Sequence, residues 1–152
     1  MALDGLTESK DAYVEHEGGW RGRCYICLAL DWSGFDWANF LRLAEELAER
    51  DDDAAKRSAV SRAYYAVYCL ARDALEVRGL CDRSEAESHH KEVWDAFEGD
   101  SRREWKRIGA FGHLLREDRR QADYDEQVPN LPRFTDGAMR RARRLNADLR
   151  SL

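Results

Sequence analysis

The sequence has no long run of apolar residues. No stretch approaches the roughly 18 residues that a membrane span needs. The first residues, MALDGLTESKDAYVEHE, also lack a basic start followed by an apolar stretch, which is the pattern of a secretory signal peptide. We therefore expect one globular domain in the cytoplasm with no part in a membrane, since 152 residues suffice to bury a core.

Cysteines are few, and their spacing does not form a complete ligand set. Cys24 and Cys27 form a C-x-x-C, which is half of a zinc site or a redox pair, but no second C-x-x-C follows. His89 and His90 follow Cys81 and offer another way to complete a set. We expect reduced, structural thiols, with no metal and no cofactor.

Charge is unevenly distributed along the chain. The net charge of −5 argues against a general nucleic-acid coat protein. Residues 36–53 are rich in acids, whereas residues 101–120 and the C-terminal tail are rich in arginine. Each basic run is interpreted either as a solvated helix surface or as a local phosphate-binding surface.

Apolar residues recur at offsets of three and four, and no β-type alternation occurs. This predicts an all-α fold, an up-and-down bundle of four main helices plus a C-terminal helix, in residues 35–152. Residues 1–34 show no sustained period and are expected to be an N-terminal extension, either flexible or upstream of the fold.

Local signals predict the helix ends. Asp36 is a ready N-cap for the first helix, and Gly79 a natural stop for the second, which covers residues 57–79. Two capping boxes, Ser84 with Glu87 and Ser101 with Glu104, predict the starts of the third and fourth helices. VPNLP, residues 128–132, predicts a loop, because two prolines so close together break a helix. A last helix is expected to begin at Thr135 or Asp136. Its inward residues are Met139, Ala142, Leu145, Leu149 and Leu152.

An arginine lies on the apolar face of the fourth helix. The inner face reads Trp105, Ile108, Gly112, Leu115, Arg119 and Ala122. An unpaired guanidinium on a core face costs several kcal/mol, so it must find acceptors. Two interpretations remain open, a structural pair of Arg119 with Asp123 at i+4, or an arginine that faces phosphate in a groove between helices.

The second helix carries tyrosines beside an arginine. We predict that Tyr64 packs in the core, while Tyr65 and Arg62 lie nearer to Arg119 and Tyr124. His90, on the inner face of the third helix, is either a core histidine with its hydrogen bonds satisfied or a catalytic group.

Four segments together resemble a known family. They are FDWANFLRLAEELA, RSAVSRAYYAVYCLARDALEVRG, SHHKEVW and RRQADYD. The combination is similar to the HEPN family of helical domains, and more narrowly to its prokaryotic branch, which is marked by S-R-A-Y-Y-A and A-D-Y. The resemblance covers about residues 35–127.

The resemblance implies a bundle that dimerises, often encoded beside a minimal nucleotidyltransferase in toxin–antitoxin or defence loci. Many relatives are metal-independent endoribonucleases, with an arginine followed after four to six residues by a histidine. Arg119 stands at the place of that arginine, but Tyr124 stands at the place of the histidine, and Arg120 where a polar residue is usual. Arg107 and His113 match the spacing literally but face about 120° apart on a helix.

Three functions stay open. They are binding of RNA or a nucleotide, cleavage of RNA with an unexpected proton carrier, and protein binding without catalysis. The candidate catalytic residues are Arg119, Asp123 and Tyr124, with His90 and His113 as alternative proton carriers, because a tyrosine near pKa 10 suits that task poorly. The candidate ligand-binding residues are Arg62, Tyr65, Arg119 and Arg120.

We also expect a homodimer. Trp94, Trp105, Phe111 and Phe134 give more large aromatics than a bundle this small easily hides.

Overall fold

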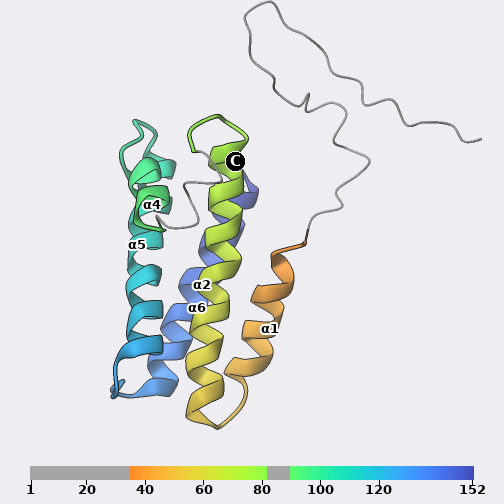
Figure 1. Ribbon diagram of the computed structural model, residues 1–152, viewed down its shortest axis with the longest axis vertical. Coiled ribbons are helices and arrows are strands. Elements are labelled where there is room, and N and C mark those ends of the chain that lie inside the picture. Colours follow the sequence, from red (N-terminus) through yellow and green to blue (C-terminus); the bar gives the residue numbers. More distant parts are fainter. Residues whose placement is uncertain (1–34, 82–89) are drawn as a thin grey trace, which may run out of the picture. The chain divides into compact units, whose positions relative to one another are not determined.

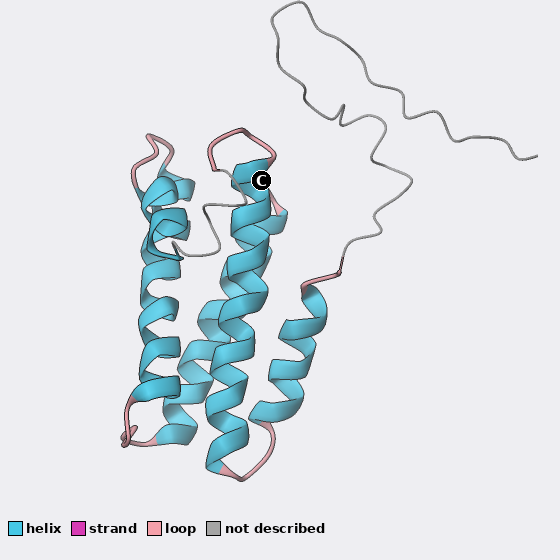
Figure 2. Ribbon diagram, in the orientation of Figure 1, coloured by secondary structure: helices cyan, strands magenta, loops and turns pink. Residues whose placement is uncertain are grey.

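The computed structural model describes residues 35–81 and 90–152, and its helical unit runs from Asp36 to Leu152. These residues form five helices and no strand: α1 (Ala38–Ala48), α2 (Asp53–Glu76), α4 (His90–Glu98), α5 (Arg103–Tyr124) and α6 (Leu131–Arg150). The long helices alternate in direction (Figures 1 and 2). The predicted all-α, up-and-down bundle is therefore confirmed.

Helix α2 is the central element of the bundle. It packs against all four other described helices, α1, α4, α5 and α6. The alanines of α2 allow this close approach, because Ala59, Ala63 and Ala66 are completely buried. As predicted, Tyr64 is also in the core, with 1% of its surface exposed.

Large aromatic residues fill the space between α4 and α5. Trp94, Phe97 and Trp105 are almost fully buried there, with the rings of Phe97 and Trp105 4.8 Å apart. Phe111 and Phe134 are partly buried and pack against the same core. The monomer thus accommodates the aromatics, so the reason given above for a dimer is wrong, while the dimer itself stays a prediction.

Two predicted N-caps are displaced by one residue. Helix α1 begins at Ala38 with Trp37 as its cap residue, although Asp36 Oδ1 still accepts a hydrogen bond from Ala38 N at 3.0 Å. Helix α5 begins at Arg103 with Arg102 as its cap residue, so Ser101 is not the N-cap. Asp100 explains the second shift, because its carboxylate binds both the backbone N–H and the guanidinium of Arg102.

The ends of α6 also differ from the prediction. The helix begins at Leu131 rather than at Thr135, with Asn130 as its N-cap. Pro132 lies within the first turn, where a missing N–H costs no intrahelical hydrogen bond. Leu152 lies beyond the helix end and is 36% exposed, so it does not belong to the inward stripe.

Gly79 ends α2 as predicted. Its φ of +66° is left-handed, and two backbone hydrogen bonds close the end, from Leu80 N to Leu75 O and from Gly79 N to Glu76 O. This pair of bonds is the Schellman arrangement, which favours glycine at that position.

Some predictions lie outside the described residues. These are the N-terminal extension of residues 1–34, the Cys24–Cys27 motif and the Ser84–Glu87 capping box. Of the helices in residues 35–81 and 90–152, none combines the length and the apolar character that crossing a bilayer requires.

Two glycine-to-alanine substitutions should have opposite effects on stability. A Cβ on Gly112 would lie 2.1 Å from the Trp94 ring, whereas a Cβ on Gly137 would meet only an arginine side chain at 3.8 Å. We expect Gly112→Ala to destabilise the protein by about 1–3 kcal/mol through overpacking. Gly137→Ala should stabilise it by up to about 1 kcal/mol through helix propensity. Urea unfolding measures both, and equal stabilities would contradict the close packing of α5 on Trp94.

Candidate functional site

Arg119 and Tyr65 meet where α5 packs against α2. Arg119 NH2 donates a hydrogen bond to Tyr65 Oη at 3.0 Å, and the Arg119 guanidinium lies 5.4 Å from the ring centroids of both Tyr65 and Tyr124. Arg119 Nε lies 2.8 Å from Asp123 Oδ2, the i+4 ion pair that the sequence suggested. The structure therefore brings these four predicted residues together.

Arg62 also belongs to this cluster. Its guanidinium lies 5.3 Å from the centroid of the Tyr65 ring and 5.1 Å from that of Phe40. Contact with aromatic rings is favourable for a cation, by about 0.5–1 kcal/mol when exposed. The predicted grouping of Arg62 and Tyr65 near Arg119 is confirmed in its geometry.

Arg120 is not part of the cluster. It is exposed and pairs with Glu117 at 2.8 Å and with Asp125 at 3.2 Å. The hydrogen bond from Arg120 also lowers the pKa of the Glu117 carboxyl. Because two carboxylates already hold this guanidinium, the geometry gives no support to Arg120 as a ligand-binding residue.

His113 and Arg107 have separate partners. His113 Nε2 lies 3.1 Å from Asp95 and 3.4 Å from Glu98, both on α4. Arg107 instead pairs with Asp148 of α6 at 3.3 Å. The literal arginine–histidine spacing in the sequence therefore does not correspond to one site in the folded chain.

His90 lies within the tyrosines of α2. Its ring stacks on Tyr68 with centroids 4.1 Å apart, and it contacts Tyr65 edge-on at 5.7 Å. His90 Nδ1 and Tyr64 Oη are 2.9 Å apart, and Trp94 Nε1 donates to the same Tyr64 oxygen at 3.4 Å. His90 is thus both a packed histidine and a neighbour of the Arg119 cluster.

The hydrogen bonds around Tyr64 determine the tautomer of His90. Burial raises the pKa of Tyr64 well above its usual value, so the hydroxyl keeps its proton. Among the described residues, His90 Nδ1 is the acceptor in position to receive that proton, and an unused buried donor is costly. Neutral His90 therefore accepts at Nδ1 and carries its own proton on Nε2.

Positive charges surround this histidine. Burial lowers the pKa of His90, and the charges of Arg119, Arg116 and Arg72 lower it further. Arg72 pairs with Asp73, whereas no carboxylate in residues 35–81 or 90–152 pairs with Arg116. The cluster thus has an uncompensated positive charge next to a neutral histidine.

Tyr124 is the exposed member of the cluster. Its side chain follows directly after Asp123 at the end of α5, and 68% of its surface is exposed. Exposed aromatic rings are surfaces on which nucleobases stack. Tyr124 is therefore better placed to contact a ligand than to act in a buried proton transfer.

Sequence reasoning missed three contributors. Arg116 lies one helical turn before Arg119, a spacing that places both on related faces of α5, and this signal was present in the sequence. Arg57 and Ser61 bind the end of α5 and lie, respectively, two turns and one turn before Tyr65 on α2. Those contacts join residues more than 60 positions apart in the chain, so no local sequence pattern predicts them.

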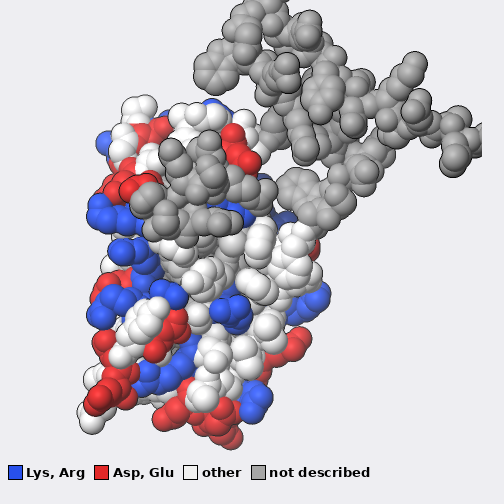
Figure 3. All heavy atoms as spheres, viewed as in Figure 1, with Lys and Arg blue, Asp and Glu red and all other residues white. Residues whose placement is uncertain are grey.

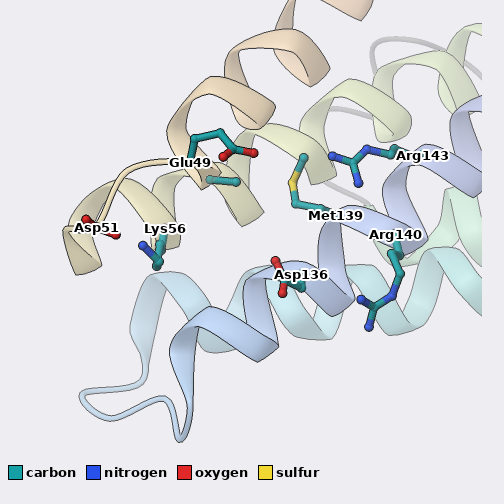
Figure 4. A pocket seen from close by; sticks show the side chains of 8 residues that line it. Glu49, Asp51, Lys56, Asp136, Met139, Arg140 and Arg143 are labelled. Carbon is teal, nitrogen blue, oxygen red and sulfur yellow. The ribbon is translucent and has the colours of Figure 1, made fainter.

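A separate cavity of about 400 Å³ lies between the α1–α2 turn and α6 (Figure 4). Its lining carries carboxylates and cations in equal number: Glu49, Asp51 and Asp136, against Lys56, Arg140 and Arg143. Such a balance gives no preference for an anion. Lys56 is already bound to the Arg50 carbonyl oxygen, and Arg143 to Glu45.

One face of the molecule can be examined for charge in the space-filling view. Basic and acidic residues are interspersed over the face drawn in Figure 3. Within residues 35–81 and 90–152, no group of three or more histidine, cysteine or acidic side chains is arranged to hold a metal ion. The face drawn in Figure 3 therefore offers a phosphate ligand a few local groups rather than a broad basic patch.

Comparison with known proteins leaves the chain without an assigned relative. No family model, no curated protein and no solved structure matches it.

Acidification should destabilise the protein through His90. The folded pKa lies below the usual 6.5, so the unfolded chain binds more protons, and stability is lost as pH falls below that value. We expect His90→Asn, which keeps an acceptor for Tyr64, to lose less stability than wild type between pH 7 and 5. Melting temperatures at both pH values measure this, and equal losses in the two proteins would contradict it.

Proposed function

We propose that the bundle is a HEPN-like module that binds RNA or a nucleotide through a phosphate group. The proposed ligand groups are Arg116, Arg119 and the Nε2–H of His90. One observation carries the proposal: Arg119 and His90 both contact Tyr65, and among the described residues only Asp123 pairs with Arg119 as a carboxylate. The charges of Arg119 and Arg116 also lower the pKa of His90, which favours its neutral form.

The burial and fixed orientation of the Arg119 guanidinium suit phosphate recognition. Its side chain is 23% exposed, and NH2 donates a hydrogen bond to Tyr65. Nε lies 2.8 Å from Asp123 Oδ2 without forming a hydrogen bond, so Nε and NH1 have donors to offer a ligand. A guanidinium that is already oriented loses little freedom on binding, and guanidinium–phosphate bonds are charge-assisted. Arg116 adds a full positive charge from the preceding turn.

A base beside the bound phosphate would find Tyr124. Stacking of a nucleobase on an aromatic side chain contributes about 1–3 kcal/mol and tolerates any base. Since Arg119 lies against the Tyr124 ring, one nucleotide can contact both residues through its phosphate and its base. This favours an unpaired nucleotide over a base-paired helix as the ligand.

Binding of RNA is favoured over its cleavage because of the direction of the hydrogen bond between Tyr64 and His90. Cleavage without a metal needs a base to take the proton of the ribose 2′-hydroxyl. The one lone pair of neutral His90 is on Nδ1 and accepts from Tyr64, so it is not available to a ligand. The endoribonuclease alternative would need another proton carrier.

The biological setting follows from the family resemblance alone. It implies a toxin–antitoxin or defence component, a homodimer, and a nucleotidyltransferase as partner. The third alternative, a bundle that only binds protein, differs by having no affinity for phosphate. The biological setting, the dimer and the partner remain predictions. The RNA-binding experiment separates binding of RNA from binding of protein alone.

Substitution of either arginine, Arg116 or Arg119, should weaken RNA binding. We expect wild type to bind a fluorescein-labelled, single-stranded RNA of mixed sequence at low salt, measured by anisotropy. Arg116→Ala and Arg119→Ala should each weaken binding about tenfold. Each should also reduce the slope of log affinity against log salt concentration by the amount expected for about one phosphate contact. Arg103→Ala, an exposed arginine in the first turn of α5, is the control and should bind as wild type.

The same samples test cleavage. After incubation with total and transfer RNA in the presence of EDTA, we expect intact RNA. Cleavage that is lost in Arg119→Ala would establish the endoribonuclease instead. Equal affinity of wild type and both variants would contradict the proposed site, and no RNA binding at all would favour the protein-binding alternative.

The mass in solution tests the implied dimer. The chain has a mass of 17.6 kDa, and light scattering at micromolar concentration should give twice that value. A monomeric mass would contradict the homodimer that the resemblance implies.

A further inference from the structure

Arg57 of α2 binds only the backbone at the end of α5. Its NH1 donates to Ala122 O at 2.8 Å and to Asp125 O at 2.7 Å, and its NH2 donates to Glu126 O at 3.1 Å. The last carbonyl groups of a helix have no intrahelical partners, and a cation there also interacts favourably with the helix dipole. One guanidinium thus caps α5 and holds the first residues after it.

Two more residues of α2 continue this contact at intervals of four. Ser61 Oγ donates to Asp123 Oδ2 at 3.3 Å, and Tyr65 Oη accepts from Arg119 at 3.0 Å. Residues four apart lie on one face of a helix. Arg57, Ser61 and Tyr65 therefore form a single row of hydrogen bonds, here called the α2 row, which holds residues 119–126.

We infer that Arg57 is a positioning residue for the phosphate site, an inference that rests on the function proposed above. Its three acceptors flank Asp123 and Tyr124, which neighbour Arg119 in the site. Arg57 acts through the backbone of this segment and does not contact the ligand. Loss of its hydrogen bonds frees the end of α5, so that Arg119 and Tyr124 are no longer held in one arrangement.

Arg57→Lys separates position from charge. Lysine keeps the positive charge but lacks the planar fork that reaches three carbonyl oxygens at once. If the charge of Arg57 mattered, the lysine variant would bind RNA as wild type does. If the fork matters, binding weakens although the charge is conserved.

The matched control is Arg78→Lys. Arg78 lies just beyond the opposite end of the same helix and also donates to backbone oxygens, those of Ala74 at 2.7 Å and Leu152 at 3.1 Å. The change of side chain is identical, but it is remote from residues 119–126. Ser61→Ala removes the middle hydrogen bond of the α2 row and serves as a second variant.

The test combines RNA anisotropy at several salt concentrations with hydrogen exchange. We expect Arg57→Lys to weaken binding between about two- and thirtyfold, with the salt dependence of wild type. Amides of residues 122–126 should exchange faster, Ser61→Ala should weaken binding less, and Arg78→Lys should bind as wild type. Melting curves of each variant show that the bundle is folded.

Two results would overturn the inference while the proposed function stands. One is wild-type affinity in Arg57→Lys. The other is unchanged exchange of the amides of residues 122–126 in an Arg57→Lys protein that has lost affinity, which would mean that Arg57 does not act through this segment. Absence of RNA binding by the wild-type protein would instead reject the proposed function, and this inference with it.

Discussion

The central position of α2 obliges its polar side chains to find partners inside the protein. The helix is covered by α1, α4, α5 and α6, and yet it carries tyrosines and arginines between its alanines. A buried polar group without a partner costs more than most single contacts contribute. The other helices are therefore arranged so that they supply hydrogen-bond partners for the polar side chains of α2.

Two directions of hydrogen bonding meet this requirement. Toward α4, the Tyr64 hydroxyl joins Trp94 and His90 in the core, and this bond determines which nitrogen of His90 is protonated. Toward α5, Tyr65 meets Arg119, while Arg57 meets the carbonyl oxygens at the helix end. The contacts that stabilise the bundle are thus also the contacts that orient the candidate site.

This dual role explains why an arginine on an apolar face is tolerated. Asp123 and Tyr65 satisfy Arg119 in part, and the aromatic rings of Tyr65 and Tyr124 cover it. Arg116 and Arg62 have no carboxylate partner among the described residues, so the cluster remains positively charged although the whole chain is acidic. The net charge of a protein says little about such a local balance.

The sequence by itself determined the helices and their inner faces, because a period of 3.6 residues follows from the backbone geometry of a single segment. It also predicted that Tyr64 would be buried, and it offered the Arg119–Asp123 pair as one of two interpretations, because residues four apart lie on one face of a helix. It misplaced the cap of α5, where Asp100 binds the backbone N–H of Arg102 and Arg102 becomes the cap residue. Tertiary structure alone decided that His113 pairs with α4 and that Arg57 holds the end of α5. These contacts depend on which helices become neighbours, and that is a property of the packed bundle rather than of any one segment.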